Sequence, residues 1–356
     1  MTKPSVIKKS LHSLVVLVKS TAYWGVGLCF IFQSVTSLVA QHGEAVEPAL
    51  DRQYFSQPHL GTIVQIAFYA NDKERSQLLA GQCFERVETL NKTFSDYLPD
   101  SEVSQLCAKP AKVAYTVSDD LFCVMAQAQE ISKATEGAFD ITLGRATQKW
   151  RESARQNKLL PETGENQATF QDVILNPKKK TVLLRQPLKI DLGGIAKGYI
   201  ADQLMVILKQ AGIRQAAVII GGEMVFTEAP PGKEGWRVGV ERPSHETLGV
   251  LTLSNTALST SGDSYQFFEL DGVRHAHLID PASGKAKSNR LNVTTLAPSA
   301  ILADAWATAL RVSTPENALK LASERKEIEA AYIPFGIPAT FTAGFPKLQK
   351  PEQRPG

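Results

Sequence analysis

The sequence lacks the common signals of a disulfide-rich, zinc-binding or nucleotide-fold protein. It has four cysteines in 356 residues, with no CxxC pair and no histidine nearby at metal-ligand spacing, so neither a disulfide framework nor a zinc site is indicated. The phosphate-binding patterns GxxxxGK[ST] and GxGxxG are also missing, which argues against an ordinary kinase or Rossmann fold. Without repeats or low-complexity tracts, and with 43% apolar residues, the chain is typical of a globular enzyme.

An imbalance of charge is confined to residues 1–40, which hold four lysines and no acid around an apolar stretch at residues 24–32. This arrangement is typical of an export signal, and we expect cleavage near Ala40. Retention as an N-terminal anchor is the alternative. Cleavage and retention both place the rest of the chain in the periplasm or another extracytoplasmic space. Beyond residue 40, 35 basic residues stand against 36 acidic ones, so nothing indicates nucleic-acid binding.

Three cysteines follow the leader: Cys83, Cys107 and Cys123. Buried thiols are one interpretation, and a single bridge from Cys123 to Cys83 or to Cys107 is another. The remaining pattern divides the chain into a linker at 41–58, one large domain at 59–346 and a flexible tail at 347–356.

Periodicity predicts a strand at 60–69, a helix at 73–90 and a helix that begins after Ser118 and stops at Gly137. Residues 151–180 are polar and rich in turn formers, so we expect loops there. A strand at 188–192, a glycine turn, a helix to about Gln210 capped by Gly212, and a strand at 216–220 follow, and a last helix begins at Ser299.

Polar residues in four segments are candidates for chemistry. The turn at residues 191–198 combines Asp191, two glycines and Lys197, and its free backbone amides suit a phosphate, although such turns are common. Asp304 and Thr308 are four apart on one helix face and could supply oxygen to a hard cation such as Mg²⁺. Local hydrogen bonding at the helix start is the alternative.

The two other candidate segments follow short strands or turns. Residues 258–263 and 275–284 contain His277, the natural candidate for removing a proton from an incoming hydroxyl, although a lone histidine is often structural. Asp140 lies in a turn at 137–142, where capping of that turn is the simpler interpretation.

Eight motifs in this order resemble the ApbE family of flavin transferases. They are FSDYLPDS at 94–101, GAFDIT at 137–142, IDLGGIAKGYIADQL at 190–204, GGE at 221–223, WRVG at 236–239, TSGD at 260–263, HLIDPASG at 277–284 and ADAWATAL at 303–310. The resemblance covers residues 61–346. It implies an α+β fold with mixed β-sheets flanked by helices in two intertwined subdomains.

The resemblance also implies roles for individual residues. Mg²⁺ would be held by Asp304, Thr308 and the backbone carbonyl of Gly194, while His277 would be the catalytic base and Lys197 would stabilise charge. Residues expected to contact FAD are Tyr97, Asp140, Asp191, Lys197, Ser261, Gly262, Asp263 and the backbone of Ile279.

The activity implied is Mg²⁺-dependent transfer of the FMN half of FAD to a serine or threonine of an acceptor protein, with release of AMP. A redox-pump subunit or a flavocytochrome-like reductase would be the acceptor, and membranes would be met only through the leader or that partner. An exported FAD carrier without transfer, and an FAD pyrophosphatase giving FMN and AMP, remain the alternatives. Cys107 in place of asparagine, Arg145 in place of proline and a short segment between 150 and 191 depart from the family pattern.

Overall fold

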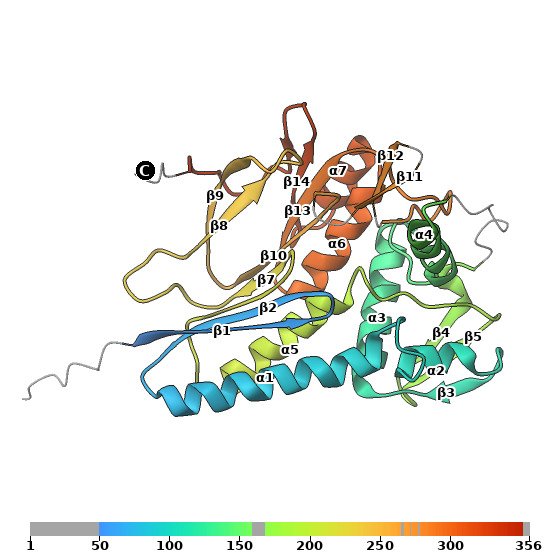
Figure 1. The fold of residues 1–356 in the computed structure, drawn as a ribbon, viewed down its shortest axis with the longest axis horizontal. Coiled ribbons are helices and arrows are strands. Elements are labelled where there is room, and N and C mark those ends of the chain that lie inside the picture. Colours follow the sequence, from blue (N-terminus) through green and yellow to red (C-terminus); the bar gives the residue numbers. More distant parts are fainter. Residues whose placement is uncertain (1–49, 159–167, 265–266, 271, 277, 352–356) are drawn as a thin grey trace, which may run out of the picture. The chain divides into compact units, whose positions relative to one another are not determined.

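A computed structural model describes residues 50–158, 168–264, 267–270, 272–276 and 278–351. Its main feature is an antiparallel sheet of eight strands in the order β1-β2-β6-β7-β10-β13-β14-β15 (Figure 1). The strands are β1 (Asp51–His59), β2 (Thr62–Ala70), β6 (Ala216–Ile220), β7 (Glu223–Phe226), β10 (Thr256–Gly262), β13 (Leu291–Ala297), β14 (Glu329–Pro334) and β15 (Thr340–Phe341).

The helices of the described residues are α1 (Lys73–Phe94), α2 (Glu102–Ala108), α3 (Asp119–Ala134), α4 (Gly144–Gln156), α5 (Ala196–Gln210), α6 (Ala300–Val312) and α7 (Pro315–Ser323), with a short 3₁₀ helix, η1, at Phe170–Asp172. Of these, α1, α5, α6 and α7 contact strands of the large sheet, while α2 and α3 pack on other helices. Strand β6 shows how the sheet separates two cores, because side chains alternate between its faces. Ala216, Val218 and Ile220 join the helical core, whereas Ala217 faces a second core on the other side.

Three small antiparallel sheets complete the fold. They are β3 (Ala114–Thr116) with β5 (Thr181–Leu184) and β4 (Val173–Asn176), β8 (Trp236–Glu241) with β9 (Thr247–Leu253), and β11 (Phe267–Leu270) with β12 (Val273–Ala276). The β8–β9 ribbon supplies Val238, Val240, Leu251 and Leu253 to the second core. The described residues form one compact unit, and the α+β class expected from the sequence is confirmed.

Most predicted elements and several predicted caps are present. The Ser118 hydroxyl accepts a hydrogen bond from the Leu121 amide at 3.2 Å, and Ser299 is the N-cap of α6. Gly212 follows α5 with a φ of +85°, a left-handed conformation that suits glycine. No helix among the described residues is both long and apolar enough to cross a membrane.

The structure differs from the sequence predictions in local structure at four places. The linker predicted at 41–58 contains strand β1, which was missed because it is a mostly exposed edge strand with no apolar alternation. The loop predicted at 151–180 begins inside α4 and includes β4. The strand predicted at 188–192 makes one bridge, from Lys189 to Leu143, and in the tail predicted to be flexible Gln349 pairs with Val250.

Candidate active site

Helices α5 and α6 cap each other at their N-termini, and this fixes the centre of the site. Both oxygens of Asp202 on α5 accept the first amides of α6, from Ala300 at 2.8 Å and Ile301 at 2.9 Å. In return, Oδ2 of Asp304 on α6 accepts the amide of Gly198 in the first turn of α5 at 2.9 Å. Neither helix has a side-chain hydrogen bond from its own N-cap residue, so each depends on the other helix.

Glycines let the two helices approach this closely. A Cβ atom on Gly198 would lie 2.2 Å from the carbonyl oxygen of Ala300, a distance that atoms cannot adopt. A Cβ atom on Gly194 would lie 3.0 Å from both the hydroxyl and the methyl of Thr308. The glycine turn therefore lies directly against the face of α6 that carries Asp304 and Thr308, as the sequence predicted.

Strand β10 adds a third wall to this cluster. The hydroxyl of Ser261 on β10 lies 3.3 Å from the hydroxyl of Thr308 on α6. The two side chains are therefore neighbouring polar groups of the same cluster. Asp304 is 1% exposed and Ser261 is 9% exposed. The structure thus brings together four of the predicted residues, Gly194, Ser261, Asp304 and Thr308.

The cluster holds more negative than positive charge. The ammonium of Lys197 pairs with a carboxylate oxygen of Glu223 at 2.6 Å, which leaves the carboxylate of Asp304 without a full counter-charge. Burial, reinforced by the nearby Glu223, raises the pKa of Asp304 to about 7 despite the opposing effect of Lys197. Burial lowers the pKa of Lys197, but Glu223 and Asp304 outweigh it and hold that pKa above its ordinary value.

These residues fit a hard divalent cation. A carboxylate, a hydroxyl and a glycine backbone offer oxygen donors, which is the donor type that Mg²⁺ prefers. The second oxygen of Glu223 is buried and has no hydrogen-bond partner among the described residues, so it adds an acceptor without a donor to this cluster. Within the described chain no three His, Cys, Asp or Glu side chains form a metal cluster, so bound phosphate or water would have to complete such a site.

Two other predicted carboxylates are used in local turns. Oδ1 of Asp140 accepts the amide and the hydroxyl of Thr142, each at 2.8 Å, and Oδ2 accepts the amide of Phe170 at 2.8 Å. This is the turn-capping geometry that the sequence left open as the simpler interpretation. Oδ1 of Asp191 accepts the amide of Gly193 at 2.8 Å and holds the glycine turn in shape.

Asp263 lies in a buried charge network beside the site. It is 2% exposed, and its Oδ2 lies 3.1 Å from Nε of Arg274, while a nitrogen of Arg311 lies 4.0 Å from its Oδ1. Gly262 lies against Asn292, whose side-chain oxygen a Cβ atom would meet at 2.1 Å. These contacts stabilise the end of β10 and leave Asp263 little capacity for a ligand.

Ile279 is buried and makes a bridge to Ala286. His277 lies outside the described residues, so its role as catalytic base stays a prediction. The three cysteines after the leader are free thiols, of which Cys83 is buried and Cys123 is exposed.

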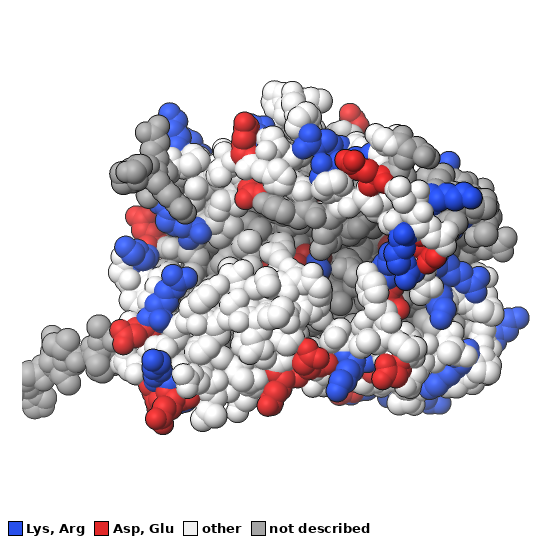
Figure 2. Space-filling model, in the orientation of Figure 1, with Lys and Arg blue, Asp and Glu red and all other residues white. Residues whose placement is uncertain are grey.

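Tyr97 lines a cavity of about 350 Å³ beside the segment that leads into the glycine turn. Asp96, Cys107, Lys189 and Ile190 share its lining, and Ile190 directly precedes Asp191. Figure 2 shows the face of the molecule hollowed beside α4, with lysine and arginine side chains gathered around that end. This cavity is large enough for part of a dinucleotide, although it does not include Asp304.

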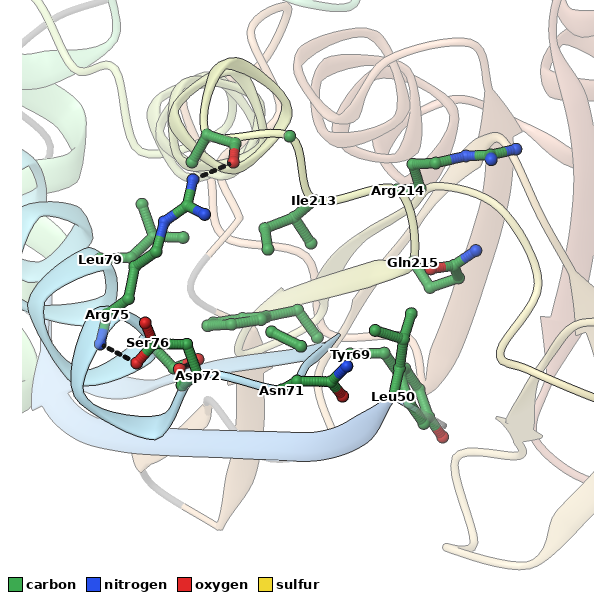
Figure 3. Close-up of a pocket in the computed structure, with 14 residues that line it drawn as sticks. Leu50, Tyr69, Asn71, Asp72, Arg75, Ser76, Leu79, Ile213, Arg214 and Gln215 are labelled. Atoms are coloured by element: carbon green, nitrogen blue, oxygen red, sulfur yellow. Dashed lines mark hydrogen bonds between the residues drawn. The ribbon is translucent and has the colours of Figure 1, made fainter. Parts of the chain in front are cut away.

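A second cavity, of about 300 Å³, lies at the opposite end of α5 (Figure 3). Leu50, Leu79 and Ile213 provide apolar walls, and Arg75 donates to the carbonyl oxygen of Ala211 at 2.8 Å. A helix of 15 residues is about 22 Å long, so this cavity is distant from the glycine turn. We assign it no part in the candidate site.

Sequence reasoning missed three residues of the site. Glu223 was noticed only as part of a GGE motif, and its pairing with Lys197 required the tertiary contact between β7 and α5. Asp202 gives no signal in the sequence beyond that of a polar residue on an amphipathic helix, and its cap of α6 required the tertiary contact. Arg151 fell in a segment expected to be loop, yet it lies on α4 and pairs with both Asp96 and Asp191.

The ApbE family model matches residues 60–332, which include every element of this cluster. The chain belongs to the ApbE family. It is 30% identical over 286 residues to a protein of Vibrio cholerae named FAD:protein FMN transferase, covering 78% of this chain and 86% of the relative. A relative with the same name from Escherichia coli K12 is 28% identical over 291 residues, covering 77% and 81% of the two chains.

Solved structures give the same result for the fold. The apo flavinyl transferase ApbE of Pseudomonas stutzeri superposes with a TM-score of 0.75 at 27% identity, covering 83% of this chain and 96% of its own. The flavin transferase ApbE of Vibrio cholerae has a TM-score of 0.72 at 26% identity, covering 83% and 98%. The α+β fold of this ApbE-family chain is therefore that of known flavin transferases.

Proposed function

We propose that this ApbE-family protein is an FAD:protein FMN transferase that depends on Mg²⁺ and moves FMN from FAD to a serine or threonine of an acceptor protein, releasing AMP. The observation that carries the proposal is the contact between the glycine turn and the face of α6 that bears Asp304 and Thr308. The names of the similar proteins support the flavin-transfer activity, and the oxygen-rich, negatively charged cluster supports the metal.

Cleavage of a diphosphate requires neutralisation of the charge on its oxygens. Asp304, Thr308 and the backbone of Gly194 would hold Mg²⁺, which supplies that neutralisation when bound. Glu223 fixes the ammonium of Lys197 near Asp304, where it can stabilise the charge that develops on the leaving phosphate. The buried wall formed by β10 and α6 excludes water from this side of the cluster.

His277 is proposed to take the proton of the acceptor hydroxyl. The prediction is that His277→Ala spares FAD binding and slows transfer. Unchanged transfer by this variant would remove His277 from the mechanism.

The activity is tested with the purified full chain, FAD, Mg²⁺ and an acceptor domain that carries a serine or threonine flavinylation motif. We expect a fluorescent acceptor band on a denaturing gel that disappears when EDTA removes Mg²⁺. FAD binding without a labelled band would indicate a carrier instead. AMP release that is as fast without acceptor as with it would indicate a pyrophosphatase.

We also propose that residues 1–40 direct export, so that the reaction takes place in the periplasm or an equivalent compartment. The acceptor would be an exported redox-pump subunit or flavocytochrome-like reductase. Fractionation of expressing cells, followed by N-terminal sequencing of the exported protein, tests the location and cleavage near Ala40. Recovery of the active enzyme from the cytoplasm alone would contradict it.

A further inference from the structure

The side chain of Arg151 on α4 joins three segments beside the glycine turn. One guanidinium nitrogen, Nη1, lies 2.5 Å from Oδ2 of Asp96, and Nη2 lies 3.5 Å from Oδ2 of Asp191. The guanidinium carbon lies 4.0 Å from the centre of the Tyr97 ring. A single planar cation therefore connects α4, the segment after α1 and the turn that leads to the proposed metal site.

Tyr97 keeps an open ring face despite this contact. The residue is 72% exposed although the guanidinium covers one side of its ring. The same residue lines a cavity together with Lys189 and Ile190, the two residues that precede Asp191. Because an aromatic ring has two faces, a flat apolar surface remains free at the mouth of that cavity.

The charges around Arg151 favour a positioning role over an independent anion site. Asp96 and Asp191 side chains are 10% and 15% exposed, so one cation serves two largely buried carboxylates. Burial and the nearby Asp191 raise the pKa of Asp96, while Arg151 opposes that rise. The guanidinium has no excess positive charge to offer a phosphate, but its plane is fixed by two acids and can hold the ring of Tyr97 in one orientation.

We propose that Arg151 is a positioning residue for the dinucleotide substrate. It holds Tyr97 from behind so that the open face of the ring stacks on a planar ring of FAD, either the isoalloxazine or the adenine. This inference rests on the proposed function, because that function supplies the substrate. Arg151 itself touches no reacting atom.

The test compares Arg151→Ala with Arg155→Ala in the full chain. Arg155 lies on the same helix, is 73% exposed and pairs with Glu152, so its loss removes the same charge without touching Tyr97. FAD binding is followed by the change in flavin fluorescence, and KM and kcat are measured with an acceptor domain. We expect Arg151→Ala to weaken binding and raise KM about tenfold with kcat unchanged, and Arg155→Ala to change neither.

Two further variants separate positioning from fold stability or direct phosphate binding. Arg151→Lys keeps a positive charge between Asp96 and Asp191 but cannot stack a planar group on the Tyr97 ring. Compared with Arg151→Ala, it should restore thermal stability and recover only part of the affinity for FAD. In a Tyr97→Ala background, Arg151→Ala should have no additional effect on FAD binding. If Arg151→Ala weakens FAD binding in the Tyr97→Ala background as much as it does in the wild type, Arg151 contacts the substrate directly and the proposal is overturned.

The remaining outcomes are also distinguishable. If the wild-type chain fails to bind FAD, the proposed function fails. If it binds FAD and Arg151→Ala binds equally well, only the positioning role fails. Competition by FMN or by AMP identifies the stacked ring, since the competitor that carries it should lose affinity in Arg151→Ala while the other does not.

Discussion

Replacement of Asp304 by asparagine separates the helix cap that this carboxylate makes from the metal-binding role proposed for it. Asp304 accepts the amide of Gly198, so Asp304→Ala would leave a buried donor without a partner at a cost of about 1–3 kcal/mol. Asparagine keeps an acceptor oxygen at that place and removes only the charge. The asparagine variant therefore tests the metal without breaking the cap.

The expected change in stability depends on Mg²⁺. Because burial raises the pKa of Asp304 to about 7, the folded state binds this proton more tightly than the unfolded state does. The free energy of unfolding therefore falls as the pH rises toward 7, and the loss is complete above that pH. Each pKa unit corresponds to about 1.4 kcal/mol, so Asp304→Asn should be more stable than the wild type in EDTA at pH 8, by an amount on the order of a few kcal/mol. Addition of Mg²⁺ at about 100 times its Kd should stabilise the wild type by about 2.7 kcal/mol and leave the variant unchanged.

Denaturant unfolding of the full chain, with and without Mg²⁺, measures both effects, and the acceptor-labelling gel measures transfer. Asp202→Asn is the matched control, since it also neutralises a partly buried carboxylate that caps a helix but one outside the proposed metal site. The control should keep its response to Mg²⁺. An equal gain from Mg²⁺ in Asp304→Asn and in the wild type would refute the metal assignment, and a variant less stable than wild type in EDTA would refute the argument from buried charge.

Three further perturbations test the packing and the charges around the site. Gly194→Ala should push on the side chain of Thr308 and lower Mg²⁺-dependent transfer while the unfolding midpoint changes little; full activity would contradict the close contact. Gly198→Ala should destabilise the chain by about 3 kcal/mol in urea unfolding, because its Cβ would meet the backbone of α6, and a wild-type midpoint would show that the helices are not in contact. Burial raises the pKa of Asp202 to about 6, so the folded state binds its proton more tightly than the unfolded state, and the unfolding free energy should fall as pH rises from 4 to 6. That fall should be smaller in Asp202→Asn, and identical pH profiles would contradict the assignment.

The sequence by itself determined the elements with strong local signals. The Ser118 hydroxyl caps the helix that follows it, and Gly212 ends α5 in a left-handed conformation, so local hydrogen bonding and backbone freedom settle these two positions. Ser299 marks the start of α6, but the first amides of that helix are capped by Asp202 of α5. The order of the motifs indicated the family. The spacing of four residues placed Asp304 and Thr308 on one face of a helix.

Elements without such signals could not be predicted. Strand β1 is polar and mostly exposed, and its structure comes from nine residues paired with β2, which no local pattern reveals. Likewise, residues 188–192 look like a strand because apolar and polar residues alternate, yet they make a single bridge and two backbone hydrogen bonds to residues 141–144 in place of a full ladder.

Only the tertiary structure decided what each polar residue does. The sequence does not distinguish the surroundings of Asp140, Asp191 and Asp304. Asp140 accepts hydrogen bonds from a turn, Asp191 accepts one amide and pairs with Arg151, and Asp304 is buried between two helices beside the carboxylate of Glu223. The pairing of Glu223 with Lys197, and the placement of Arg151 behind Tyr97, each join segments distant in sequence. The sequence specifies which charges exist; their surroundings after folding set which remain uncompensated and therefore available to bind a cation.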